Sequence, residues 1–111
     1  MYSRYVILQI KNNMVREFPH VFEREILPLL RKQKGFLDEL ILAAPGKAEM
    51  ITISLWETKE LAEVYNREVY PGIIKILNKY IEGVPVLKTF EVEYATFPSF
   101  QKFGAVVTAS N

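Results

Sequence analysis

A short stretch of the chain carries side chains suited to binding a planar organic molecule. Thr52, Ser54 and Trp56 alternate with apolar residues, which places them on one face of an extended strand. A tyrosine, Tyr65, follows nine positions after the tryptophan. Indole offers a stacking face and an N–H donor, and hydroxyl groups hydrogen-bond substrate oxygens. These four residues form the candidate ligand-binding set, whereas no residue is identified as catalytic.

Each aromatic member of this set also has a structural explanation. Large aromatic residues mostly pack in protein cores, so Trp56 is also expected as a core residue where a strand meets a helix. Tyr65 fits an amphipathic helix with its hydroxyl in water equally well. A phenol with a pKa near 10 polarises a substrate group and does not act as a base at neutral pH.

The other titratable residues show no convincing base. His20 lies off the apolar stripe of its predicted helix, which indicates a solvated or interfacial histidine. Asp38 and Glu39 fall in one predicted strand, and Glu91 and Glu93 fall in another. Charges in strands usually mark an exposed face or edge, where they prevent aggregation.

Composition excludes several classes of function. The chain has 111 residues, no cysteine and one histidine, so we expect no metal site and no cofactor. The net charge of +1 argues against a strongly basic nucleic-acid-binding protein. No apolar run approaches the roughly 18 residues of a membrane span, and the N-terminus does not resemble a signal peptide. We therefore expect a cytoplasmic protein without a membrane or nucleic-acid partner.

Hydrophobic periodicity predicts four strands and two interrupted helices. The predicted strands span residues 5–11, 36–44, 50–57 and 86–97. The first helix contains Pro28, which predicts a kink or a break. The second begins at an N-cap, Thr58, is interrupted at residues 70–72, and continues over residues 73–81.

The order β-α-β-β-α-β predicts an α+β, ferredoxin-like fold, with a four-stranded antiparallel sheet and both helices on one face. Residues 1–97 form this single domain, and residues 98–111 are expected to be an extension, either an arm or a short strand. The hydroxyl-bearing face of the third strand suits a pocket beneath the helices. The opposite face, with Ile51, Ile53 and Leu55, suits a second copy of the sheet, so a homodimer is predicted.

Three local patterns carry a family resemblance. Residues 29–36 (LLRKQKGF) end a helix and open a strand, residues 53–62 (ISLWETKELA) join a strand to a charged helix start, and residues 70–74 (YPGII) break the second helix. Together they resemble the antibiotic-biosynthesis-monooxygenase-like proteins of the dimeric α/β-barrel superfamily. The resemblance implies a face-to-face dimer with a pocket between helices and sheet in each subunit. The members of this family include cofactor-free oxygenases of phenols and quinols, haem-degrading enzymes and proteins without a known reaction.

The chain departs from the family's functional patterns. The haem-degrading branch has a histidine on the second helix, whereas residues 73–76 contain Lys75 and no histidine. That branch has a second tryptophan, and many quinol-oxidising relatives a histidine, near the position of Tyr65. An asparagine of one phenol-oxidising branch is replaced by Thr52, so Trp56 is the shared feature.

Two hypotheses follow from these patterns. The first is a small-molecule-binding protein that resembles cofactor-free monooxygenases of phenolic or quinol compounds and takes a small aromatic ligand. The second is a non-catalytic dimeric binding or structural module with the same fold, which the missing family histidines favour. An open cavity lined by the candidate residues favours the first, and a cavity filled by apolar side chains favours the second.

Overall fold

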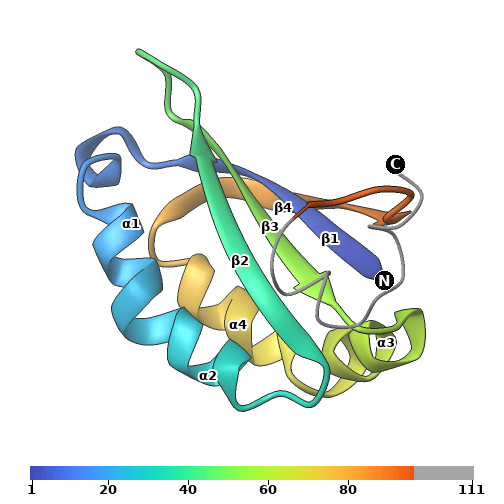
Figure 1. Ribbon diagram of the computed structural model, residues 1–111. Helices are drawn as coiled ribbons and strands as arrows, with labels where there is room; N and C mark the ends of the chain where they lie inside the picture. The colour runs from blue at the N-terminus through green and yellow to red at the C-terminus, as the bar shows by residue number, and fades with distance from the viewer. Residues whose placement is uncertain (97–111) are drawn as a thin grey trace.

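The computed structural model describes residues 1–96, which form the predicted α+β, ferredoxin-like arrangement (Figure 1). Helices cover one face of a curved four-stranded antiparallel sheet. The elements in chain order are β1 (Tyr2–Ile10), the 3-10 turn η1 (Asn12–Met14), α1 (Phe18–Val21), the π-helical turn η2 (Phe22–Ile26), α2 (Leu27–Arg31), β2 (Phe36–Ala43), β3 (Glu49–Trp56), α3 (Lys59–Glu68), α4 (Tyr70–Leu77) and β4 (Ile81–Glu91). The predicted extension at residues 98–111 lies outside the described residues.

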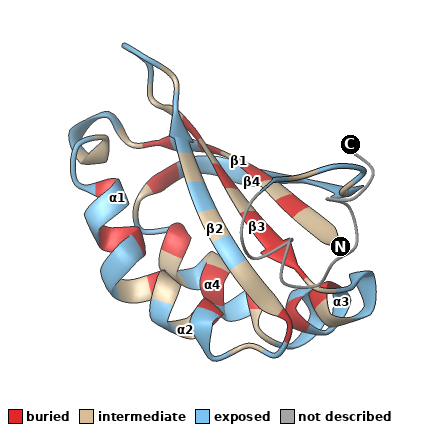
Figure 2. Ribbon diagram, in the orientation of Figure 1, coloured by how far each residue is buried: buried red, intermediate tan, exposed pale blue. Residues whose placement is uncertain are grey.

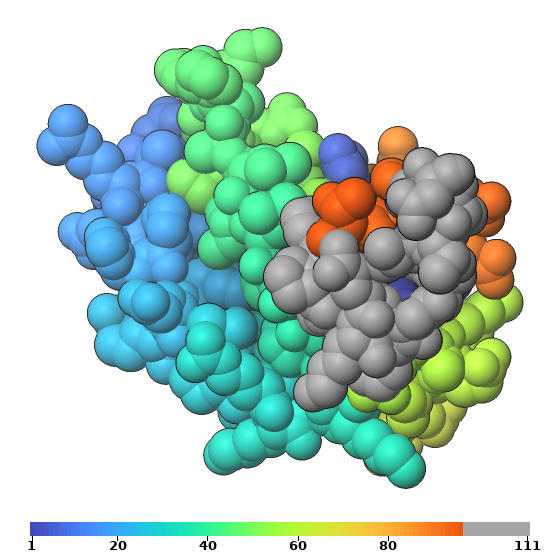
Figure 3. Space-filling model, in the orientation of Figure 1, coloured from blue at the N-terminus to red at the C-terminus, as the bar shows by residue number. Residues whose placement is uncertain are grey.

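The strand order is β2-β3-β1-β4, so β1 and β3 are central and β2 and β4 form the edges. β2 and β3 pair as the predicted antiparallel hairpin, and their turn projects beyond the body of the molecule (Figure 3). Both other pairings, β1 with β3 and β1 with β4, are also antiparallel. Because each central strand has neighbours on both sides, side chains from all four strands can lie in one row across the sheet.

The fourth strand begins earlier than the sequence predicts. β4 spans Ile81–Glu91 instead of residues 86–97, and Ile81, expected in a helix, is buried and pairs with the end of β1. Gly83, with φ of 72°, and Pro85 lie where the pairing register with β1 shifts. These residues mark an irregularity within the strand and do not end a helix, because a glycine with positive φ and a proline without an N–H both suit a bulge on an edge strand.

The first helix changes its pitch around the predicted break. α1 continues into η2 and α2 without interruption, and the Leu27 N–H donates to the Phe22 carbonyl five residues earlier. Pro28 is in the first turn of α2 and lacks the N–H that would continue the hydrogen-bond ladder, at the point where the π-helical turn ends. The predicted kink or break is therefore a π-helical turn, in which Phe22 and Ile26 are both buried.

The second helical segment has the predicted cap and the predicted interruption. The Thr58 hydroxyl oxygen accepts a hydrogen bond from the Leu61 N–H at 3.1 Å. α3 ends at Glu68, and α4 begins at Tyr70, with Pro71 in its first turn. The interruption changes the helix direction between two tyrosines, so the rings of Tyr65 and Tyr70 lie 6.0 Å apart on the same side of the sheet.

The core lies between the helices and one face of the sheet (Figure 2). Thr52, Ser54 and Trp56 are buried on this face, together with alternate residues of β1. The predicted phase of β3 is therefore correct. The opposite face carries two successive rows of residues that are apolar except for one lysine, and no described helix covers it. The first row is Leu40, Ile53, Tyr5 and Lys88, and the second is Leu42, Ile51, Ile7 and Val86.

Candidate functional site

A row of polar side chains crosses the helix-facing side of the sheet. Glu39 on β2 pairs with Ser54 on β3, Ser54 pairs with Arg4 on β1, and Arg4 pairs with Thr89 on β4. We call these four residues the polar row. Residues paired across neighbouring strands point to the same face, so the register alone brings four polar side chains to the layer where the core is expected.

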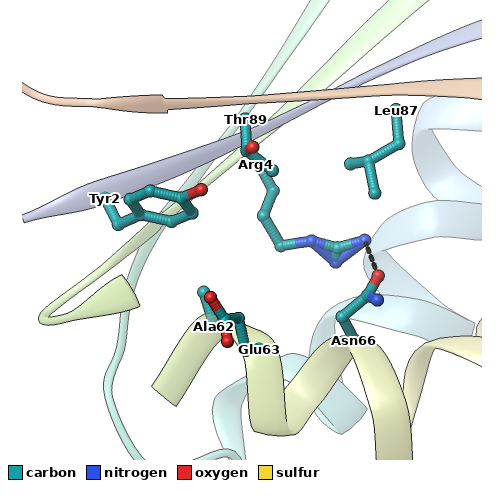
Figure 4. A pocket seen from close by; sticks show the side chains of 7 residues that line it. All are labelled: Tyr2, Arg4, Ala62, Glu63, Asn66, Leu87 and Thr89. Carbon is teal, nitrogen blue, oxygen red and sulfur yellow. Dashed lines mark hydrogen bonds between the residues drawn. The ribbon is translucent and has the colours of Figure 1, made fainter. Parts of the chain in front are cut away.

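Arg4 is the charged centre of this row. Only 2% of the residue is exposed, and its side chain extends from β1 toward α3 (Figure 4). One terminal nitrogen donates to the Asn66 carboxamide oxygen at 3.0 Å. The guanidinium carbon lies 4.8 Å from the centre of the Tyr65 ring and 4.3 Å from that of Tyr70. The two rings stabilise the cation through their negative faces and hold the guanidinium in place.

An open cavity lies beside Arg4, between α3 and the strands β1 and β4 (Figure 4). It has a volume of about 180 Å³. Its walls are formed by Tyr2, Arg4, Ala62, Glu63, Asn66, Leu87 and Thr89. A cavity of about 150 Å³ in another protein accepts benzene. This outer cavity therefore suits a single aromatic ring and is far too small for a haem.

A second, smaller cavity, also lined by Arg4, lies beneath the helices. Its volume is about 20 Å³, close to that of one water molecule. Its polar lining consists of Arg4, Glu39, Thr52, Ser54, Tyr65 and Tyr70, and its apolar lining consists of Val6, Phe22, Ile26, Leu30, Ile73 and Leu77. Arg4 lines both this inner cavity and the outer one, so its side chain is part of the wall of each.

Burial dominates the protonation of this cluster. It raises the pKa of the Glu39 carboxyl to about 9, although the charge of Arg4 acts in the opposite direction. Burial also raises the pKa of the Tyr65 and Tyr70 hydroxyls, again against the effect of Arg4. The pKa of Arg4 is lowered by burial, but an arginine keeps its charge at neutral pH. At neutral pH the cluster therefore holds one positive charge and an uncharged Glu39.

Three residues of the predicted ligand-binding set, Thr52, Ser54 and Tyr65, line the inner cavity. Trp56, the fourth, lines neither the inner nor the outer cavity. It has no exposed surface, its ring packs 4.8 Å from that of Tyr65, and its indole N–H donates to the Ser54 hydroxyl at 2.9 Å. The structure thus brings the four residues together, with Trp56 supporting the wall of the inner cavity.

None of the predicted residues lines the outer cavity, and the two charged-type residues at the centre of the site, Arg4 and Glu39, were not identified from the sequence. Glu39 was predicted on an exposed strand face, but it is only partly exposed, and one of its carboxylate oxygens is buried without a hydrogen-bond partner in residues 1–96. The cause is a register shift in β2 between Phe36 and Asp38, which turns Glu39 toward the helices. Arg4 shares the alternation phase of Val6, a core residue of β1, and that phase was the available signal.

The remaining titratable candidates lie away from the cavities beside Arg4. His20, Glu91 and Glu93 are exposed, as the sequence predicts. Within residues 1–96, no three or more histidine, aspartate or glutamate side chains form a group that could hold a metal ion. None of the helices in this part of the chain is long and apolar enough to cross a membrane.

Comparison with known proteins shows the fold. No protein-family model and no curated protein matches the chain. A monooxygenase from the gene ActVA-Orf6 of Streptomyces coelicolor, solved with nanaomycin D, matches at a TM-score of 0.71 and 14% identity over 87% of this chain and 91% of that chain. SnoaB, a cofactor-independent oxygenase from Streptomyces nogalater, matches at a TM-score of 0.69 and 16% identity over 87% of this chain and 96% of that chain.

A further solved structure, an antibiotic biosynthesis monooxygenase, matches at a TM-score of 0.64 and 12% identity over 83% of this chain and 98% of that chain. The chain therefore has the fold of antibiotic biosynthesis monooxygenases. At these identities the similarity concerns the fold, whereas the residues that line the cavities are this chain's own.

Proposed function

We propose that the protein binds a small aromatic molecule in the outer cavity and oxidises it as a cofactor-independent monooxygenase of phenols or quinols. The observation that carries this proposal is the pair of cavities beneath α3 and α4, which share a buried arginine and are lined by hydroxyl and carboxyl groups. The fold supports it, because two proteins with this fold are a monooxygenase and a cofactor-independent oxygenase.

The reaction needs little machinery from the protein. A phenol with a free para position loses its hydroxyl proton and one ring hydrogen. One atom of dioxygen becomes the second carbonyl oxygen of the quinone, and the other atom leaves as water. The substrate gives four electrons and dioxygen accepts four, so no further oxidant or reductant takes part. The protein must hold the ring, accept the phenolic proton and exclude water from the reacting centre.

The residues around the cavities suit these tasks. Tyr2 and Leu87 provide apolar surface for a ring, and Arg4 and Asn66 provide polar groups that orient it. Glu39 is the proposed proton acceptor, because a pKa of about 9 is close to the pKa near 10 of a phenol. The inner cavity has room for about one water, and a general base can act through one water. A single water would therefore relay the phenolic proton to the Glu39 carboxylate.

Oxygen uptake with a panel of single-ring phenols and hydroquinones tests the proposal. We expect one phenol of the panel to be converted to its quinone with one dioxygen consumed per product, and a rate that rises toward pH 9 as Glu39 ionises. Glu39→Gln should remove most of the rate and its rise with pH. The matched control is Glu91→Gln on the exposed edge strand. Uptake no faster than in buffer for every compound would contradict the proposal.

A second candidate function, a binding module without chemistry, is favoured by the packing around the inner cavity. Apolar side chains such as Phe22 and Leu77 reduce that cavity to about 20 Å³, and the indole N–H of Trp56 is already bonded to Ser54. A module of this kind would bind single-ring aromatic compounds and consume no oxygen with any of them. Binding and uptake measured on the same compounds therefore separate the two functions.

A homodimer is part of the same proposal. The sheet face opposite the helices carries the rows that contain Ile53 and Ile51, and Leu40 and Leu42 on this face are each 43% exposed. A contiguous apolar surface of this kind is rarely left in water. The occupant with the simplest symmetry is a second copy of the same face. Sedimentation of the full chain at micromolar concentration should give twice the monomer mass of 12.9 kDa.

A further inference from the structure

Within residues 1–96, Arg4 is a buried cation that forms no ion pair. A buried charge is costly unless an opposite charge or hydrogen bonds compensate it, and arginine cannot avoid the cost by losing its proton. In residues 1–96, the Arg4 side chain donates to the Asn66 carboxamide oxygen, interacts with the Tyr70 hydroxyl, and makes no ion pair within 4 Å. Its Nε is buried with no hydrogen-bond partner in that part of the chain. The guanidinium is therefore held in place but not neutralised.

The two nearby carboxyl groups do not supply the missing charge. Glu39 is uncharged at neutral pH, and its buried oxygen has no partner in the described residues. Glu63 lines the outer cavity, but its side chain is 57% exposed and pairs with Lys59 at 3.8 Å. A carboxylate that faces water is screened, so it neutralises a buried cation only weakly.

We propose that the outer cavity binds a single-ring aromatic carboxylate, with the carboxylate against the Arg4 guanidinium. The inference deepens the proposed function and rests on it for the identity of the reaction: the substrate would be a phenolic acid. The positive charge, the Asn66 contact and the open volume of about 180 Å³ meet at one point between β1 and α3 (Figure 4).

The shape of the cavity agrees with this ligand. Guanidinium and carboxylate are both planar, and their charge-assisted hydrogen bonds are stronger than neutral ones. Tyr2, Ala62 and Leu87 supply apolar walls for the ring beside the charged group. A carboxylate is ionised throughout the neutral range, whereas a phenol with a pKa near 10 is not, so the carboxylate is the group that neutralises Arg4.

A matched pair of ligands tests the inference on the full chain. 3-Hydroxybenzoate and 3-hydroxybenzamide have nearly the same shape, differ in charge, and leave the position para to the hydroxyl free. Titrations followed by the backbone amide signals of α3 should show the carboxylate binding about tenfold or more tightly than the amide. Arg4→Met should abolish this preference. Arg67→Met, at an exposed position of α3, should leave it unchanged. Equal affinity for both compounds in the unaltered protein would overturn the inference.

Glu63→Gln gives a second, independent test with the opposite sign. Removing a negative charge from the wall of the outer cavity should tighten binding of the carboxylate by about two- to threefold and leave the amide unaffected. Weaker binding of the carboxylate in this variant would contradict the inference, even if the Arg4 variant failed to fold.

The binding titrations need no turnover, so they separate this inference from the proposed function. If the protein prefers the carboxylate through Arg4 but consumes no oxygen with phenolic acids, the anion site is supported and the proposed monooxygenase activity is contradicted. If it oxidises neutral phenols and shows no preference for a carboxylate, the proposed activity is supported and the anion site is contradicted.

Discussion

At one level of the sheet, the helix-facing side is polar and the opposite side is apolar, the reverse of the usual distribution. Under the helices, the polar row places Arg4, Ser54 and Glu39 in the layer where apolar side chains normally pack. On the opposite face, the neighbouring row places Ile53, Tyr5 and Leu40 where no described helix covers them. The difference indicates that each face contacts something beyond the helices of the same chain. We infer a ligand on the helix side and a second copy on the other.

The largest expected loss of stability is at Trp56, and it tests whether the side chains around the polar row form a packed core. Trp56→Ala should lower the free energy of unfolding by about 3–5 kcal/mol, because it removes a fully buried ring that packs against Tyr65. Phe90→Ala, at a ring that is 51% exposed, should cost less than about 1 kcal/mol in a monomeric background. Urea unfolding of both variants measures the difference, and equal losses would contradict the assignment of the two faces.

A smaller loss is expected where β2 meets α3. Gly35 has φ of 87°, and an added Cβ would lie 2.6 Å from the Leu61 Cδ1 atom. Gly35→Ala should therefore cost about 2–4 kcal/mol, from backbone strain together with overpacking. Gly46 has φ of 71° and open space around it, so Gly46→Ala should show the backbone strain alone, about 1–2 kcal/mol. If both variants lost the same stability by thermal unfolding, the contact with Leu61 would be unimportant.

The polar row should make stability depend on pH. The pKa of Glu39 is raised from 4.5 to about 9, so between these values the folded state holds a proton that the unfolded state has lost. Stability conferred by that proton is fully present below pH 4.5 and is lost as the pH rises toward 9. Glu39→Gln should therefore stabilise the protein by about 1–3 kcal/mol at pH 8 and by almost nothing at pH 4.

Thermal unfolding of Glu39→Gln at both pH values measures that effect, with Glu93→Gln as the exposed control. A stabilisation of equal size at pH 4 and pH 8 would show that burial of the carboxyl is not its source.

The smallest effect on the stability of a single chain is expected on the opposite face. Leu42→Lys places a charge among exposed apolar residues and should change the free energy of unfolding of the monomer by less than about 0.5 kcal/mol. The same change should weaken a dimer strongly, because each lysine would be buried without a partner in the apolar interface. Sedimentation at several concentrations checks this, and an unchanged mass of twice the monomer would place the interface elsewhere.

Particular elements show how far sequence reasoning reaches. The alternation of β3 correctly predicted that Thr52, Ser54 and Trp56 face the helices, because a strand on a one-sided core must keep its period of two. The start of β4 was not predicted, because Gly83 and Pro85 resemble helix stop signals and only pairing with β1 shows them inside a strand. For the same reason Glu39 was placed on the wrong face: its orientation depends on a register shift in β2.

The sequence by itself determined the order of the elements, the Thr58 cap, the interruption at Pro71 and the inward face of β3. Each depends on local spacing and on conformational preferences that neighbouring residues carry. Only the tertiary structure brought Arg4 beside Asn66, Tyr65 and Tyr70, which lie more than sixty positions away. The strand register and the packing of α3 against the sheet bring these residues together. They follow from how the whole chain packs, because long-range pairing is a property of the assembled core that no local pattern encodes.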